Sequence, residues 1–341
     1  MIKNEKKIYN LFNIWLLISF ILVFSIIVVG GLTRLTNSGL SITQWELFKG
    51  ILPPLNSTTW NQYFDLYKKI PQYELLNPSM SLSEFKVIFY WEYFHRVIAR
   101  FIGIFFIIPF LYFYLSKKIN KNYLIICLFV SILIIIQGIV GWYMVKSGLV
   151  NDITVSHYRL SLHLFIALII ISKLFWLILN LRNKTLKKFL YFNEKNFIFL
   201  FLLFLIFSQM TIGAFVSGLD AGMIYQTWPL MGNSYFPDDF ILTKLYNLVN
   251  FENHSLVQFY HRNLAYLIII YILYLTYYIF KNELKNLYKP LILIVFVSFL
   301  QISLGIFTLT SGINIYLASA HQITGVVLVL TAINLYYCYI K

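Results

Sequence analysis

Residues 91–115 read WEYFHRVIARFIGIFFIIPFLYFYL, in which four ionisable side chains precede fifteen residues without any acid or base. A helix needs about 20 apolar residues to cross the hydrocarbon core of a bilayer, and this run approaches that length. Charged groups are costly at membrane depth. The fold is therefore set by a membrane, and Glu92, His95, Arg96 and Arg100 need a reason to enter it.

The composition of the whole chain agrees with this interpretation. Of its 341 residues, 60% are hydrophobic and only 12% are charged, whereas soluble domains typically carry about 25% charged residues. The net charge is +14, but the basic residues gather between apolar runs, which indicates topology signals and not nucleic-acid binding. Cys127 and Cys338 lie inside apolar runs, and no C-x-x-C-H motif for covalent haem attachment is present.

The sequence predicts an all-α integral membrane protein with eight transmembrane helices. The predicted spans are Ile14–Gly31, Tyr93–Leu115, Tyr123–Val145, Tyr158–Leu179, Phe197–Ser217, Phe259–Phe280, Leu291–Leu309 and Ile315–Ile340. We expect both termini in the cytoplasm, because this places 15 basic residues on short inner segments and seven on much longer outer loops. The first apolar run has no small-residue cleavage pattern, so we expect it to remain as a span.

Two features are expected in the first outer loop. Trp60, Phe64 and Tyr67 fall on one face of a helix that Ser57 could cap, which predicts a helix lying along the membrane surface. Ser81 stands three residues before Glu84, a capping-box pattern that predicts the second long helix to begin outside the membrane.

An internal repeat divides the chain into two halves. Four segments recur in the same order, which predicts two pseudo-symmetric four-helix bundles, residues 1–190 and 191–341. The matching segments are 38–54 with 221–237, which aligns Trp45 with Trp228; 94–103 with 260–269; 137–149 with 301–313; and 159–167 with 317–325.

Four of the six histidines lie at one predicted depth. His95, His163, His261 and His321 occupy the four inward-running spans, each 19–22 residues before the first basic residue at the inner end. At about 1.5 Å per residue, all four rings are expected roughly 30 Å above the inner boundary. His157 and His254 have no counterpart in the other half, and solvated or capping roles are favoured for them.

Imidazoles paired in each half favour haem as the ligand. A zinc or copper site would gather three or four ligands, whereas two histidines on separate helices suit axial ligation of haem iron. Arg96 and Arg262 each follow a histidine and are candidate partners for haem propionates, with lipid-headgroup contact as the alternative. Glycines near these positions would let backbone approach a flat macrocycle: Gly30, Gly31, Gly138, Gly141, Gly213 and Gly305.

The halves differ in one carboxylate. Glu92 lies three residues before His95, and the matching position before His261 is Gln258, which cannot ionise. An acid beside one site only favours proton or charge chemistry there and a passive cofactor at the other. The alternative is that Glu92 simply hydrogen-bonds a neighbour.

The chain resembles the heme A synthase family over nearly its whole length. The resemblance rests on GGLTRLTNSGLSITQWE (30–46), GILPPL (50–55), EYFHR (92–96), YRLSLHL (158–164), FYHR (259–262) and HQITG (321–325). It implies that His261 and His321 ligate a resident haem b, that His95 and His163 hold the substrate haem O, and that Glu92 is the catalytic acidic residue. The first outer loop lacks the cysteine pair of some members, which excludes a thiol-mediated role there.

The implied reaction oxidises one ring methyl of haem O to a formyl group, giving haem A for cytochrome oxidase. Two hydroxylations through a gem-diol, or a cationic route that takes oxygen from water, would both reach this product. The implied partners are an unidentified electron donor, haem O synthase and cytochrome oxidase assembly factors, in a bacterial cytoplasmic membrane. The rival hypothesis is a di-haem b-type cytochrome that transfers electrons without modifying haem. A transporter is a weaker third reading, because the spans lack matching interior prolines and obvious polar groups for a substrate.

Overall fold

A computed structural model describes residues 2–44, 49–149, 153–239 and 245–340. Those residues are helical apart from turns and one isolated β-bridge, between Met231 and Ser234. The α-helices are α1 (Ile2–Leu35), α2 (Ser57–Tyr67), α3 (Pro71–Leu76), α4 (Leu82–Ser116), α5 (Lys121–Gly148), α6 (His157–Arg182), α7 (Glu194–Gly218), α8 (His254–Lys281), α9 (Tyr288–Thr310) and α10 (Ile315–Tyr339). Short 3₁₀ helices are η1 (Lys49–Ile51), η2 (Ala221–Met223), η3 (Leu245–Val249) and η4 (Lys285–Leu287).

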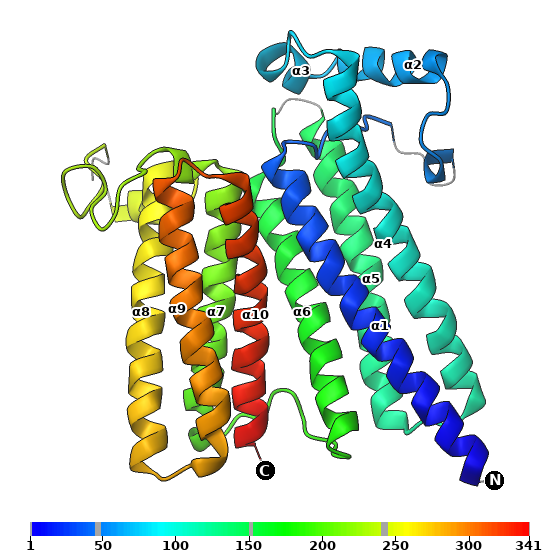
Figure 1. The fold of residues 1–341 in the computed structure, drawn as a ribbon, viewed down its shortest axis with the longest axis vertical. Coiled ribbons are helices and arrows are strands. Elements are labelled where there is room, and N and C mark those ends of the chain that lie inside the picture. The colour runs from blue at the N-terminus through cyan, green and yellow to red at the C-terminus, as the bar shows by residue number, and fades with distance from the viewer. Residues whose placement is uncertain (1, 45–48, 150–152, 240–244, 341) are drawn as a thin grey trace. The chain divides into compact units, whose positions relative to one another are not determined.

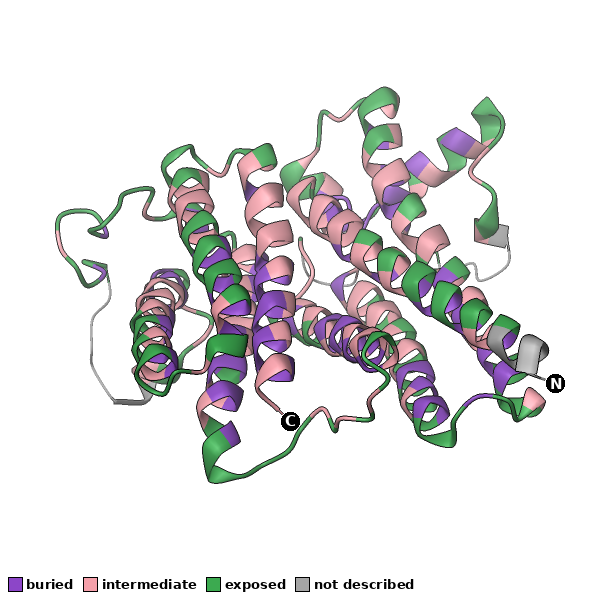
Figure 2. Ribbon diagram, turned by 60° about the horizontal axis from the view of Figure 1, so that its bottom comes forward, coloured by how far each residue is buried: buried purple, intermediate pink, exposed green. Residues whose placement is uncertain are grey.

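Eight of these helices are long and apolar enough to cross a membrane, which confirms the predicted class of fold. Large apolar side chains such as Ile108, Leu273 and Phe299 are exposed along them, and Figure 2 shows exposed residues running down the outward faces of the spans. A soluble monomer rarely exposes apolar surface of that extent, so these faces contact lipid. The chain is a multi-pass membrane protein.

The first compact unit comprises Met1–Ile170 and contains α1 to α5 and the first half of α6 (Figure 1). The aromatic residues of α1 and α4 pack together: the Trp15 ring lies 4.8 Å from Phe106 and 5.3 Å from Phe113. The Trp15 indole donates a hydrogen bond of 3.0 Å to the Phe105 carbonyl. This contact satisfies the only polar atom of a side chain that is otherwise buried in an apolar interface.

The second compact unit comprises Ile171–Lys341 and holds α7 to α10 together with the last turns of α6. Trp176 of α6 is fully buried, and its ring lies 5.7 Å from Tyr336 and 4.9 Å from Tyr337 of α10. The boundary between compact units therefore falls inside α6, not at residue 190, because these aromatic contacts tie the end of α6 to α10. The functional division into 1–190 and 191–341 stays a prediction.

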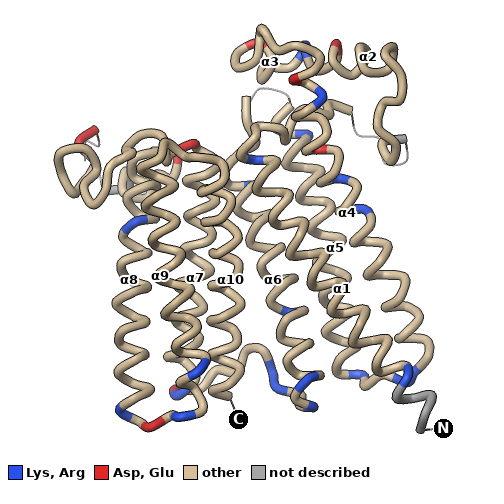
Figure 3. Tube along the Cα trace, viewed as in Figure 1, with Lys and Arg blue, Asp and Glu red and all other residues tan. Residues whose placement is uncertain are grey.

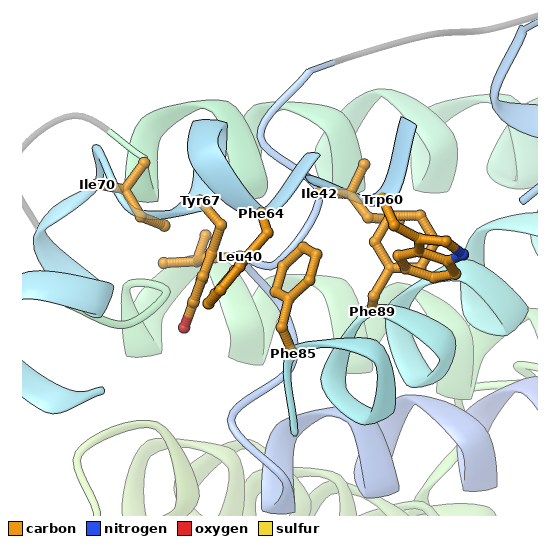
Figure 4. Packing of buried hydrophobic residues seen from close by; sticks show 8 residues of the cluster. All are labelled: Leu40, Ile42, Trp60, Phe64, Tyr67, Ile70, Phe85 and Phe89. Carbon is orange, nitrogen blue, oxygen red and sulfur yellow. The ribbon is translucent and has the colours of Figure 1, made fainter. Parts of the chain in front are cut away.

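An aromatic cluster joins the first outer loop to the outer end of α4 (Figure 4). Trp60, Phe64 and Tyr67 of α2 pack against Phe85 and Phe89, with Phe64 and Phe85 stacked at 5.0 Å. The interpretation that this face lies on the membrane surface was wrong, because α4 begins early enough to cover it.

The helix caps explain where these elements begin. The Ser81–Glu84 capping box is present, so α4 starts eleven residues before the predicted span. The cap of α2 is Asn56, not Ser57: its Oδ1 accepts a hydrogen bond of 2.8 Å from the Thr59 amide. Trp45, aligned with Trp228 in the repeat, lies outside the described residues.

Lys and Arg occupy the turns that join α8 to α9 and α4 to α5, and in the first unit Figure 3 also shows them at the opposite end of the helices. Both turns lie at the ends opposite the two long loops. Lys281 and Lys285 occupy the first of these turns, and Lys117 and Lys118 the second. This distribution supports an inward orientation of the short loops, which stays a prediction.

Candidate functional site

The structure brings the four intramembrane histidines together in two pairs. His95 on α4 and His163 on α6 have ring centroids 6.5 Å apart, with ring planes inclined at 43°. His261 on α8 and His321 on α10 have centroids 6.4 Å apart, with planes at 80°. One pair belongs to each compact unit, so each unit contains a complete two-imidazole site.

The ring separations fit a metal held between two imidazoles. A bond from metal to imidazole nitrogen is about 2.0–2.1 Å, and the ring centroid lies roughly 1.1 Å behind that nitrogen, so two axial rings stand roughly 6.3 Å apart. The described residues contain no group of three or more His, Cys, Asp or Glu that could complete a protein-only metal site. Each pair could supply two imidazole ligands to an iron whose remaining coordination came from a macrocycle, as in haem.

Each histidine lies against a glycine of a neighbouring span. A Cβ placed on the glycine would lie 2.9–3.0 Å from the histidine Cε1 in all four glycine–histidine contacts, at or below the shortest distances that real Cβ atoms keep from a neighbour. The pairs and distances are Gly30–His95 at 2.9 Å, Gly141–His163 at 3.0 Å, Gly213–His261 at 3.0 Å and Gly305–His321 at 2.9 Å. These four glycines leave space for the histidine rings. From the sequence, they were expected to let the backbone approach a flat macrocycle.

Glutamines one turn before three of these glycines were missed by the sequence reasoning. The Nε2 groups of Gln137 and Gln209 donate hydrogen bonds of 3.0 Å to the carbonyls of His163 and His261. The Nδ1 atom of His321 lies 3.1 Å from the carbonyl oxygen of Gln301. A recurring Q-x-x-x-G pattern at 137–141, 209–213 and 301–305 could have identified them; the first span has Ile26 at that position.

Glu92 is buried and fully engaged at the outer end of the first site. Its Oε2 accepts hydrogen bonds from the Ser41 hydroxyl at 2.7 Å and from the Ile42 amide at 2.8 Å. Its Oε1 forms a salt bridge of 2.5 Å with Nη2 of Arg96, one helical turn away. The carboxylate therefore holds the first outer loop against α4 beside His95.

The two arginines make the same contact in both units. Arg96 donates from Nη2 to the Ile42 carbonyl at 3.0 Å, and Arg262 donates from Nη2 to the Tyr225 carbonyl at 2.9 Å. Ile42 and Tyr225 are aligned in the repeat, so the loop contact is shared at the level of atoms. The Nε of Arg262 is buried and has no partner among the described residues, which leaves a donor suited to a carboxylate.

In the second unit, Gln258 takes the place of Glu92. Gln258 is buried, and it donates a hydrogen bond of 2.8 Å to the Tyr225 carbonyl from the position that Glu92 occupies in the first unit.

His254 is exposed at the start of α8, as favoured from the sequence. His157 is buried, with its ring 4.0 Å from that of Tyr158, so the expectation of a solvated side chain was wrong for it, and a capping role stays a prediction. It lies at the first residue of α6, where packing replaces solvent.

Eight helices long enough to span a membrane, with one pair of close imidazoles in each half, define an integral membrane protein with two candidate metal-binding sites. Residues 13–333 match the family described as cytochrome oxidase assembly protein (COX15-CtaA). Similar curated proteins are heme A synthases: that of Pelagibacter ubique is 46% identical over 97% of both chains, and that of Flavobacterium psychrophilum is 41% identical over 96% of this chain and 97% of its own. The heme A synthase of Rickettsia felis is 38% identical over 96% and 98%. The chain belongs to the heme A synthase family.

Proposed function

We propose that this chain is a membrane enzyme that oxidises one ring methyl of haem O to a formyl group, giving haem A. The observation that carries the proposal is the difference between two otherwise matching sites. A buried carboxylate, Glu92, stands beside the pair His95 and His163, whereas an amide, Gln258, stands beside the other pair. An electron-transfer cytochrome has no need for an acid at one site only, so this difference favours the enzyme over the di-haem cytochrome.

The two sites take different haems in this account. His261 and His321 bind a resident haem b, and His95 and His163 bind the substrate haem O. When bound, the resident haem would supply a one-electron redox centre. The propionates would meet Arg96 and Arg262; the orphaned Nε of Arg262 supports this assignment in the second unit. The glycines that accept the imidazole rings keep each pair at the spacing for axial ligation.

Glu92 is the residue proposed to act on the reacting methyl carbon. Its carboxylate would stabilise positive charge that develops at the methyl group or remove a proton from it. Ser41, Ile42 and Arg96 fix both carboxylate oxygens, so the group would meet the substrate already oriented. This arrangement serves a double hydroxylation, which needs an electron donor, and a cationic route, which takes oxygen from water.

The remaining assignments follow from the activity and the charge pattern. We place the chain in a bacterial cytoplasmic membrane with both termini inside and both long loops outside, since the short connections carry the basic residues. Its partners would be a haem O synthase that delivers the substrate, an electron donor and assembly factors of cytochrome oxidase.

Expression of the chain in cells that make haem O but no haem A tests this proposal. Pigments extracted from the membranes should contain haem A, together with b-type haem bound to the protein. If the protein binds b-type haem and haem A never forms, the chain is a cytochrome and the proposed activity is wrong. A Glu92→Gln variant expressed in parallel serves as the matched inactive control.

A further inference from the structure

A pocket of about 240 Å³ lies between the loop that follows α1, the helix α4 and the last turns of α5. Two of its lining residues are basic, Arg96 and Lys146. The rest of its described wall is Trp142, Thr43 and aliphatic side chains. No described lining residue is acidic, but Arg96 is already paired with Glu92, so Lys146 supplies the additional positive charge. Such a pocket suits an anionic group on an apolar body.

Two residues of the pocket wall are next in sequence to residues of the first histidine site. Arg96 directly follows His95 on α4, and Trp142 directly follows Gly141, which receives the ring of His163. Lys146 lies one helical turn beyond Trp142 toward the outer end of α5, and its amine stands 4.9 Å over the Trp142 ring. The pocket thus lies within a few residues of both imidazoles along α4 and α5, close enough for a macrocycle at this pair to place a side group there.

The basic residue at this position belongs to the first unit alone. The repeat aligns Trp142 and Lys146 with Ile306 and Thr310. A second cation, Arg159, donates to the Ser147 hydroxyl beside Lys146, and its counterpart is Leu317. The site beside Glu92 is thus more basic at its outer end than its counterpart, although the arginine after the histidine is common to both.

We infer that this pocket binds a propionate carboxylate of the porphyrin substrate between Lys146 and Arg96, which makes Lys146 a further substrate-binding residue. The inference rests on the proposed function, since it takes the substrate to be a haem that enters the first unit. Carboxylates pair strongly with two cations in a partly desolvated pocket. A site that must release its product gains from a cation on the flexible stem of a lysine, because that contact forms and breaks without moving the helix.

The test is an absorbance titration of the purified full chain, carrying its resident haem, in nanodiscs of neutral phosphatidylcholine. The probes are haem O and its dimethyl ester, in which both propionates are blocked. The wild-type protein should bind the free acid at least about 10-fold tighter than the ester. Lys146→Ala should lose about 10-fold in affinity for the acid and nothing for the ester.

The controls separate charge from folding. Lys86 also lies over a tryptophan ring, that of Trp60 at 5.1 Å, so Lys86→Ala removes a similar contact away from the pocket and should leave both affinities unchanged. Lys146→Arg should keep the preference for the acid. If Lys146→Ala fails to retain the resident haem, Lys146→Met is used in its place and compared with Lys146→Arg.

Three results would overturn the inference. The first is an unchanged preference for the free acid over the ester in Lys146→Ala or Lys146→Met. The second is a loss of affinity for the acid in Lys146→Arg as large as that in Lys146→Ala. The third is a preference for the acid that disappears in nanodiscs of anionic phosphatidylglycerol, which would make a lipid headgroup the occupant. The proposed function fails separately, if the wild-type protein binds haem O but forms no haem A. In that case a Lys146-dependent acid preference would still support the carboxylate site.

Discussion

The hydroxyl of Ser41 donates a hydrogen bond of 2.7 Å to Oε2 of Glu92, and both side chains are buried. The repeat places Ile224 and Gln258 at the corresponding positions of the second unit, so this bond belongs to the first unit alone. The second unit therefore lacks both the hydroxyl in the loop and the carboxylate on the helix. We therefore expect Ser41 to position Glu92 for its role at the substrate.

Ser41→Ala should lower the rate of haem A formation about 10-fold while the resident haem spectrum stays unchanged. A hydrogen bond to a charged group contributes about 1.5–3 kcal/mol, and its loss leaves the carboxylate less firmly held. The rate is measured from pigments of membranes with equal amounts of protein. Ser41→Thr should restore most of the activity, and Ser83→Ala, at an exposed serine, should have no effect. An unchanged rate in Ser41→Ala would show that Glu92 needs no positioning from the loop.

Glu92→Gln should lower haem A formation by about 100-fold or more, the usual contribution of a positioned acid or base. The amide keeps one oxygen that can accept from Arg96, while its NH2 group would face the Ile42 amide, which is also a donor. The haem content therefore has to be shown unchanged before the loss of product is assigned to chemistry. Haem content and product are measured on the same purified sample. Glu74→Gln, at an exposed acid of α3, is the control. Wild-type activity in Glu92→Gln would remove this residue from the mechanism.

Gly141→Ala should weaken binding of haem O, because the new Cβ would lie 3.0 Å from Cε1 of His163 and displace the ring. Gly138→Ala is a matched control on the same helix, since no described atom lies within 4 Å of its Cβ position. Both changes favour a helix by about 1 kcal/mol, so helix propensity does not explain a difference between them. Equal haem O affinities in the two variants, measured by titration, would contradict the inference that Gly141 leaves space for the His163 ring.

Trp60→Ala should lower the stability of the first outer loop by about 3–5 kcal/mol, the usual cost of removing a buried aromatic side chain. Trp60 is buried against Phe85 and Phe89, with ring centroids 6.5 and 5.0 Å away. Limited proteolysis of the loop measures the effect, and cleavage should accelerate. Leu55→Ala, at a side chain that is 79% exposed, should be cleaved like the wild type. Equal cleavage of both variants would mean that α2 is not held by α4.

The eight spans followed from the sequence because apolar length is a local property, read directly from runs of residues. The start of α4 was also predictable, since Ser81 and Glu84 form a capping box within four residues. The packing of α4 over the apolar face of α2 was not predictable, because the covering residues Phe85 and Phe89 belong to another helix further along the chain. Local periodicity predicts an apolar face but not what covers it.

Some features of the candidate site could be predicted from the sequence and others could not. The depth of the histidines and the difference between Glu92 and Gln258 came from counting and alignment of the repeat. The partners of Glu92 did not, because Ser41 and Ile42 are about fifty residues away and their contacts depend on how the loop folds back. The shared contact of Arg96 with Ile42 and of Arg262 with Tyr225 likewise required coordinates.

The most direct test of the central claim, that each half holds its own haem with two imidazoles, is the haem spectrum of two purified variants. His261→Ala should lose the low-spin spectrum of the resident haem, because that site would retain a single axial ligand. His95→Ala should keep this spectrum and lose only the binding of added haem O. An unchanged low-spin spectrum in His261→Ala, or its loss in His95→Ala, would contradict the account.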